Sequence, residues 1–118
     1  MRHKNKKKVL DRKAPARKSL IRNLAVSFII LEKLKTTKIK AKILKAKTEK
    51  LITISKKGNL FARRRLISFL GDKNQNAVRK LIEEIAPRYK TRKGGYTRLR
   101  LIGKRQGDGA EMAQVEFV

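Results

Sequence analysis

The spacing of apolar residues changes once along this chain, near residue 96. Before that point, apolar residues recur every three or four positions, as they do on one face of an α-helix. After it, Thr97, Leu99 and Leu101 alternate with Arg98 and Arg100 at a period of two, which is typical of a half-buried β-strand. The change of period predicts helices followed by a small sheet, which is an α+β fold.

Four helices are predicted, over about residues 15–33, 38–57, 60–70 and 73–86. Thr37, Asn59 and Asp72 precede three of these segments and suit the N-cap position, because their side-chain oxygens can accept a bond from a free backbone N–H. Pro87 is expected to end the fourth helix, since proline has no N–H to continue the ladder.

The inner faces of these helices give the expected core. On the first helix the apolar residues at helical spacing are Leu20, Leu24, Phe28 and Leu31, with Ile21, Ala25 and Ile29 beside them. On the second and fourth helices they are Ala41, Leu44, Thr48, Leu51, Ile52 and Ser55, then Ala77, Val78, Leu81, Ile82 and Ile85.

Two strands near the end of the chain are expected to form a hairpin across the loop of residues 103–109. A two-stranded hairpin alone is marginal, so the short extended segment at residues 33–38 is expected to add a third strand. The predicted fold is therefore about four helices packed on a small three-stranded mixed sheet, with a basic N-terminal extension.

Residues 1–18 differ in composition from the remainder of the chain. Nine of these 18 residues are Lys or Arg and one is acidic, and apolar periodicity is absent. We expect a flexible basic arm without a fold of its own, followed by a compact α/β domain at residues 19–118.

The charge of the chain indicates a polyanionic partner. The formal net charge is +25, from 34 basic and 9 acidic residues in 118. A chain so charged repels itself, and the partner that relieves the repulsion is a nucleic acid or an anionic membrane surface. The longest apolar run is interrupted by Ser27 and Glu32 and is too short to span a bilayer, so a nucleic acid is favoured and no membrane partner is expected.

An enzyme is not favoured by the residues present. The single histidine, His3, lies in the arm, where a general base would not be held in place. Glu83 and Glu84 are adjacent on a predicted helix and point about 100° apart, which is unsuitable for a shared metal. The absence of cysteine excludes a thiolate zinc site. No metal, cofactor or small-molecule substrate is expected.

The segment at residues 87–101 carries six cations and both tyrosines of the chain. Gly94 and Gly95 allow backbone amides to approach a phosphate without a Cβ in the way. Tyr89 and Tyr96 either stack on exposed bases or pack the loop against the helices. We interpret this segment as a loop that binds RNA.

Three consecutive arginines, residues 63–65, cannot all face one way on a helix. Two of them, Arg63 and Arg64, are expected to contact phosphate, and one member of the triplet is expected to bridge helices or pair with an acid such as Glu83. The pattern contains no zipper heptads and no zinc finger, so RNA is favoured over DNA. A nucleoid-type DNA-binding protein and an RNA-processing enzyme are the alternative hypotheses.

Several segments then carry a resemblance: MRHKNKKK, RKSLIRNLA, EKLKTTKIKAK, EKLITISKKG, ARRRLIS, PRYKTRKGGYTR and GDGAEMAQVEFV. Along nearly its full length the chain resembles the bacterial large-subunit ribosomal protein seventeen family. The resemblance implies a structural role in the large (50S) subunit, binding to 23S rRNA, and a cytoplasmic, ribosomal location. It also implies contacts with neighbouring proteins, such as ribosomal proteins thirty-two and twenty-two.

Two positions depart from the family pattern. Asp11 stands where the family commonly has glycine, and Ala16 stands where it commonly has histidine. The first places a carboxylate in a region expected to touch phosphate, and the second removes a ring, so the detailed contacts of the arm are open.

The residues expected to contact RNA are the cations and polar groups of the basic segments: Arg2, His3, Lys4, Lys6, Lys7, Lys8, Arg12, Lys13, Arg17, Lys18, Arg22, Asn23, Thr36, Thr37, Lys38, Lys42, Arg63, Arg64, Arg88, Tyr89, Lys90, Arg92, Lys93, Gly94, Gly95, Tyr96, Thr97, Arg98, Arg100, Lys104 and Arg105.

Overall fold

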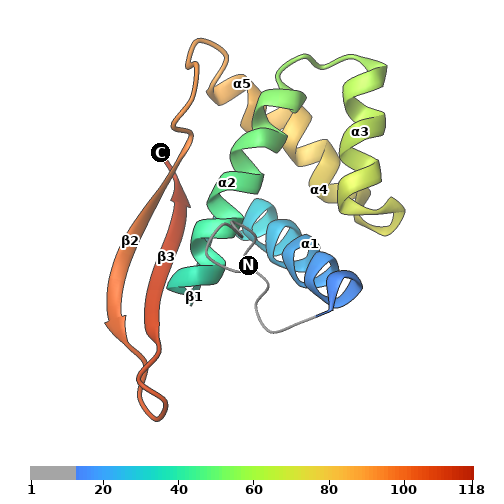
Figure 1. Cartoon of the computed structure of the whole chain (residues 1–118). Helices are drawn as coiled ribbons and strands as arrows, with labels where there is room; N and C mark the ends of the chain where they lie inside the picture. Colours follow the sequence, from blue (N-terminus) through green and yellow to red (C-terminus); the bar gives the residue numbers. More distant parts are fainter. Residues whose placement is uncertain (1–12) are drawn as a thin grey trace, which may run out of the picture.

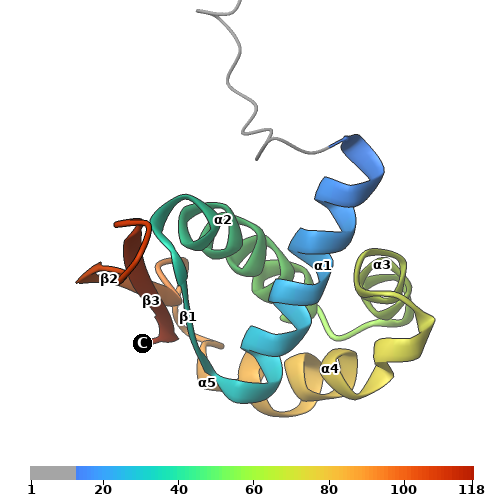
Figure 2. The same ribbon diagram turned by 90° about the horizontal axis from the view of Figure 1, so that it is seen from below.

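Helices and a small sheet form two adjoining parts of the structure (Figures 1 and 2). The computed structural model describes residues 13–118. Its elements, in chain order, are α1 (Ala14–Leu31), β1 (Lys33–Thr37), α2 (Lys38–Ser55), α3 (Leu60–Leu70), η2 (Asp72–Asn74), α4 (Gln75–Lys80), η3 (Leu81–Ile85), α5 (Ala86–Arg88), β2 (Thr97–Lys104) and β3 (Glu111–Phe117). The predicted α+β class is confirmed.

The sheet has the strand order β1-β3-β2, and both pairings are antiparallel. The expected hairpin and the expected third strand are both present. The mixed sheet was wrong, because β1 joins the sheet beside β3 and not beside β2, so the two strands that run in the same direction never pair. A register shift between Leu101 and Gly103 bends β2 near the hairpin tip.

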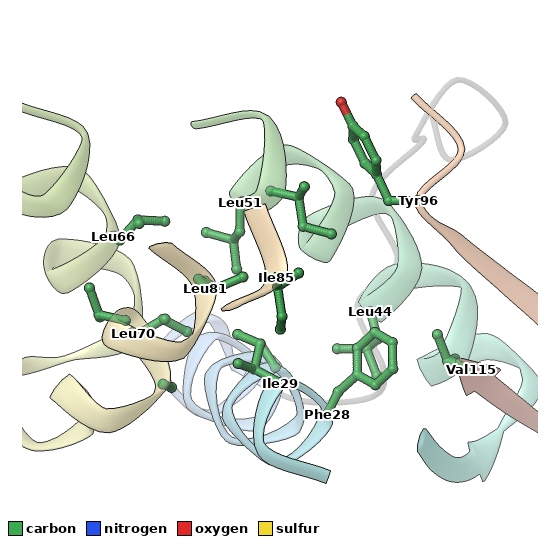
Figure 3. Packing of buried hydrophobic residues seen from close by; sticks show 14 of the residues in the cluster. Phe28, Ile29, Leu44, Leu51, Leu66, Leu70, Leu81, Ile85, Tyr96 and Val115 are labelled. Atoms are coloured by element: carbon green, nitrogen blue, oxygen red, sulfur yellow. The ribbon is translucent and has the colours of Figure 1, made fainter. Parts of the chain in front are cut away.

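The core lies where α1, α2, α3 and α4 meet and continues under the sheet to Val115 (Figure 3). Every residue predicted for the inner face of α2 is buried. On α1 the prediction was half right: Ile21, Ala25, Phe28 and Ile29 are buried, whereas the side chain of Leu31 is 65% exposed. In the last turn of the helix, Phe28 and Ile29 therefore face the core, whereas Ile30 and Leu31 face solvent.

The junction between α1 and β1 depends on Glu32. This residue adopts a left-handed conformation (φ 66°), which costs a residue with a Cβ about 1–2 kcal/mol. Its carboxylate accepts a hydrogen bond from Arg88 and lies 3.2 Å from the ammonium of Lys80. The same ammonium donates to the carbonyl of Ile30 at 2.8 Å. These contacts fix the turn that sends the chain into the sheet.

The predicted helix boundaries hold at Asn59 but fail at Pro87. The side chain of Asn59 accepts a bond from the backbone N–H of Ala62 at 2.8 Å, which confirms the N-cap. Pro87 lies within α5, so the helical path continues past it to Arg88. The preceding turn, η3, is a π-helix in which the N–H of Ala86 bonds to the carbonyl of Leu81, and this wider turn accommodates a residue without an N–H.

Candidate nucleic-acid interface

A groove of about 930 Å³ lies between α1, α2 and α3. Its walls and floor are formed by Arg17, Lys18, Ile21, Arg22, Lys42, Ile43, Ala46, Lys47, Lys50, Arg65, Ser68 and Phe69. Seven of these twelve residues are cationic and none is acidic. Within residues 13–118, none of the seven cations forms an ion pair with a carboxylate. The groove is therefore a concentrated patch of positive charge without an internal counter-charge.

The groove collects cations from three helices because each helix turns a different face to the core. On α2 the buried stripe includes Leu44, Thr48 and Ile52, so Lys42, Lys47 and Lys50 lie on other faces of the helix. On α3 the buried residues are Ala62, Leu66 and Leu70. Arg65 and Phe69, four residues apart, share the face that borders the groove.

Sequence reasoning found four of the groove cations and missed three. The four are Arg17, Lys18, Arg22 and Lys42. The missed residues are Lys47, Lys50 and Arg65. The spacing of four between Lys42, Ala46 and Lys50 was the available signal, since it places these residues along one face of α2.

The predicted pairing of the arginine triplet with Glu83 is absent from the ion pairs of residues 13–118.

A second hollow, of about 530 Å³, adjoins the groove and shares Ala46, Lys50 and Arg65 with it. Gly94 and Tyr96 from the loop before β2 border its far side. The basic groove on the helices is thus continuous with the glycine loop that the sequence singled out.

Both tyrosine rings of this loop are buried, which agrees with the second of the two alternatives for them, packing of the loop against the helices. Tyr89 is 4% exposed and Tyr96 is 1% exposed. Their ring centroids lie 5.3 Å apart, and Phe117 stacks on Phe28 at 4.4 Å beside them. The hydroxyl of Tyr89 donates to the carbonyl of Val118 at 2.8 Å. The rings fasten the loop to the core, because aromatic partners that are distant in sequence meet there.

Lys56 forms hydrogen bonds with the loop on both sides of Gly94 and Gly95. Its ammonium donates to the hydroxyl of Tyr96 at 3.1 Å and to the carbonyl of Arg92. This contact lowers the pKa of Tyr96 below its ordinary value, whereas burial raises the pKa of Tyr89. In Figure 3 the hydroxyl of Tyr96 points away from the core. The loop is therefore fastened to the body on both sides of its glycines.

Between those two attachments the loop presents its polar groups to solvent. Lys90, Arg92, Lys93, Gly94 and Gly95 are all exposed. Gly95 has a φ of 64°, a conformation that favours glycine over residues with a Cβ. This part of the prediction, a basic loop with accessible backbone amides, agrees with the structure.

Five cations predicted to contact RNA form ion pairs within the protein. Arg98 and Arg100 lie 3.3 and 3.1 Å from the carboxylate of Glu116, which is 6% exposed. Their proximity, with that of Arg98 first, lowers the pKa of Glu116. The other three pairs are Arg88 with Glu32, Lys38 with Glu111 at 3.5 Å, and Arg105 with Asp108. These cations have part of their charge neutralised within the fold.

The remaining predicted residues are distributed around the molecule. Thr97 is buried, with its N–H and hydroxyl both directed to Glu49 at 3.4 and 3.2 Å, so its contact with RNA is not available in this conformation. The exposed residues of the set are Lys13, Asn23, Arg64 and Lys104, and the partly buried ones are Thr36, Thr37 and Arg63. Arg2, His3, Lys4, Lys6, Lys7, Lys8 and Arg12 lie outside the described residues.

Comparison with known proteins decides the family. The family model described as ribosomal protein L17 matches residues 20–118. The chain belongs to the ribosomal protein L17 family. Among curated proteins, the large ribosomal subunit protein bL17 of Hydrogenobaculum sp. is 48% identical over 119 residues, covering 100% of this chain and 99% of that protein. The bL17 proteins of Exiguobacterium sp. and Agrobacterium fabrum are 48% and 49% identical, covering 92% and 100% of this chain and 96% and 82% of their own lengths.

Two further properties of residues 13–118 bear on the site. None of the helices in this part of the chain is long and apolar enough to cross a bilayer. The same residues contain no group of three or more His, Asp or Glu side chains placed to hold a metal ion.

Proposed function

We propose that this chain is a structural protein of the large ribosomal subunit that binds 23S rRNA by neutralising phosphates, without a catalytic role. Membership of the L17 family supports the assignment to the large subunit, since the curated relatives are named large ribosomal subunit proteins. The observation that carries the mode of binding is the groove between α1, α2 and α3, with seven cations and no carboxylate.

The basic loop extends this interface. Its exposed cations, Lys90, Arg92 and Lys93, directly precede Gly94, which borders the second hollow. Fastening by Lys56 and the two tyrosines reduces the entropy that the loop loses on binding. Phosphate groups crossing from the groove to the loop would meet cations and backbone amides, the two donor types that bind phosphate in proteins, and would pass the carboxylate of Glu49, which also lines the second hollow.

The salt dependence of RNA binding tests this mode. If the seven groove cations each release a counterion, raising salt from 50 to 200 mM lowers affinity for structured RNA by about four decades. Filter binding with an rRNA fragment measures this slope. An affinity that stayed constant across that range of salt would contradict phosphate neutralisation.

A pair of matched variants localises the contact. Replacing Lys50 and Arg65 by glutamine removes two groove cations, and should reduce the steepness of the log–log salt slope by about two. Replacing Lys73 and Arg79 by glutamine removes the same charge from exposed positions outside the groove. Equal losses in the two variants would indicate that only net charge matters.

Competition with duplex DNA separates this proposal from a nucleoid-type protein. Structured rRNA should displace duplex DNA when both are supplied at equal phosphate.

Contacts with ribosomal proteins thirty-two and twenty-two are part of the proposal, and cross-linking in purified 50S subunits tests them.

A further inference from the structure

The floor of the groove is apolar, which phosphate neutralisation alone does not require. Ile21, Ile43, Ala46 and Phe69 lie between the surrounding cations. A site that contacts only the backbone of an RNA duplex needs cations and other hydrogen-bond donors, and has no need of apolar side chains among them. A concave site with an apolar floor and charged walls suits a ligand that has both an apolar face and a negative charge.

Phe69 is the aromatic side chain of this floor. The ammonium of Lys47 lies 6.0 Å from the centroid of its ring, and the guanidinium of Arg22 donates from Nε to its backbone carbonyl at 3.2 Å. Arg22 uses one of its five N–H donors in that bond, so its terminal nitrogens are available. Phe69 is also only partly buried, unlike Tyr89 and Tyr96, so it is the ring that can present a surface to the groove.

From this arrangement we propose that the groove holds a single unpaired nucleotide, with its base against Phe69 and its phosphates on the surrounding cations. This inference rests on the proposed rRNA-binding function and names the RNA feature that the site selects. The volume of about 930 Å³ lies within the range of small-ligand pockets, which begins at about 300 Å³. Every RNA base has an apolar face for Phe69, and the adjacent phosphates supply the charge that seven cations attract.

The chain's own basic arm is a poor occupant of this groove. Residues 1–12 contain six Lys or Arg and one acid, so they carry the same sign of charge as the groove walls. An acidic peptide with apolar residues would match the charge, and it is treated below as an outcome of the test.

Two hairpin RNAs, identical except for one bulged nucleotide in the stem, provide the probe. The full-length protein should bind the bulged RNA about tenfold more tightly than the continuous duplex, because stacking of one base contributes on that order. The salt slopes for the two RNAs should differ by no more than about one, since the bulged RNA adds a single phosphate to the same stem. Equal affinities would overturn the inference while leaving the salt-dependent binding of the proposed function intact.

Two variants locate the stacking surface. Phe69→Leu should abolish the preference for the bulge and leave duplex binding and its salt slope unchanged. Phe61→Leu is the matched control, because Phe61 lies on the same helix, is 67% exposed and does not border the groove. A preference that survives Phe69→Leu, or is lost in Phe61→Leu, would overturn the assignment.

A further variant, Ala46→Leu, tests the same site even if Phe69→Leu does not fold. Ala46 is exposed on α2 and lines both hollows, so Ala46→Leu puts a larger apolar side chain into the groove without altering charge or removing a core residue. This variant should also lose the bulge preference and retain duplex binding. Displacement of both RNAs by an acidic, leucine-containing peptide at equal charge would instead indicate a protein ligand and overturn the proposal.

Absence of salt-dependent binding to either RNA is a different failure. That result would refute the proposed function itself, whereas salt-dependent binding without selection of the bulge would refute only the nucleotide site.

Discussion

Replacing Tyr96 with alanine is expected to destabilise the fold and not to remove an RNA contact. The ring is 1% exposed and packs against Tyr89, and the hydroxyl accepts a bond from Lys56. Lys47, in contrast, lines the groove, so Lys47→Ala is expected to weaken rRNA binding more than the loss of the Tyr96 hydroxyl does.

The size of the effect follows from what each substitution removes. Truncating a buried aromatic side chain to alanine costs about 3–5 kcal/mol of the free energy of unfolding. Tyr96→Phe keeps the ring and loses only the bond from Lys56, a partly buried ammonium that water can reach, so its cost is about 1 kcal/mol. With a melting temperature that changes by about 4 °C per kcal/mol, the expected decreases are about 12–20 °C for alanine and about 4 °C for phenylalanine.

Thermal unfolding followed by circular dichroism measures both decreases. Filter binding of the folded Tyr96→Phe protein should give an rRNA affinity within twofold of the unaltered chain, whereas Lys47→Ala should lower affinity and leave the melting temperature nearly unchanged. The reasoning is refuted if Tyr96→Ala melts within 3 °C of the unaltered protein while its RNA affinity falls more than that of Lys47→Ala.

Three other predictions follow from local contacts. Asn59→Ala should lower the free energy of unfolding by about 1 kcal/mol in a urea titration, because the N-cap bond of α3 is lost. Because the hydrogen bond from Arg98 lowers the pKa of Glu116 below its ordinary value, its contribution to stability is present above that ordinary value and is lost as pH falls through the folded-state pKa. The urea midpoint should therefore fall as the solution is acidified through that range, and by less in Glu116→Gln. Lys56→Met should speed hydrogen exchange at the amides of the glycine loop, whereas Lys57→Met, at an exposed neighbouring position, should not.

The parts of the fold that were predictable depend on local sequence. The buried stripe of α2 follows from a spacing of three and four, and the N-cap at Asn59 depends on residues within one turn. The hairpin follows from the period of two on either side of a glycine-containing loop. In each case the residues that decide the structure are neighbours in the chain.

The parts that were missed depend on contacts between distant residues. Pro87 continues the helix because the π turn before it widens the backbone ladder, and no rule of spacing indicates where such a turn forms. The burial of Tyr89 depends on Phe117 and Val118, about 30 residues further along the chain, where the end of β3 pairs with the start of β2. The groove requires α1, α2 and α3 to meet, so Lys50 and Arg65 gain their role only in the folded chain.

The cations of the groove differ from those of the sheet in whether a carboxylate pairs with them. The carboxylates that pair with cations belong to the sheet, its hairpin tip, the turn before β1, and α2 where it faces β2: Glu32, Glu49, Asp108, Glu111 and Glu116. None of them lines the groove. Arg98 and Arg100 both pair with the nearly buried carboxylate of Glu116, so their charge stabilises the sheet. The groove cations form no ion pair with a carboxylate in the described part of the chain. An approaching polyanion therefore meets, in the groove, cations that pair with no carboxylate of residues 13–118, whereas Arg98 and Arg100 on the sheet already have a carboxylate partner.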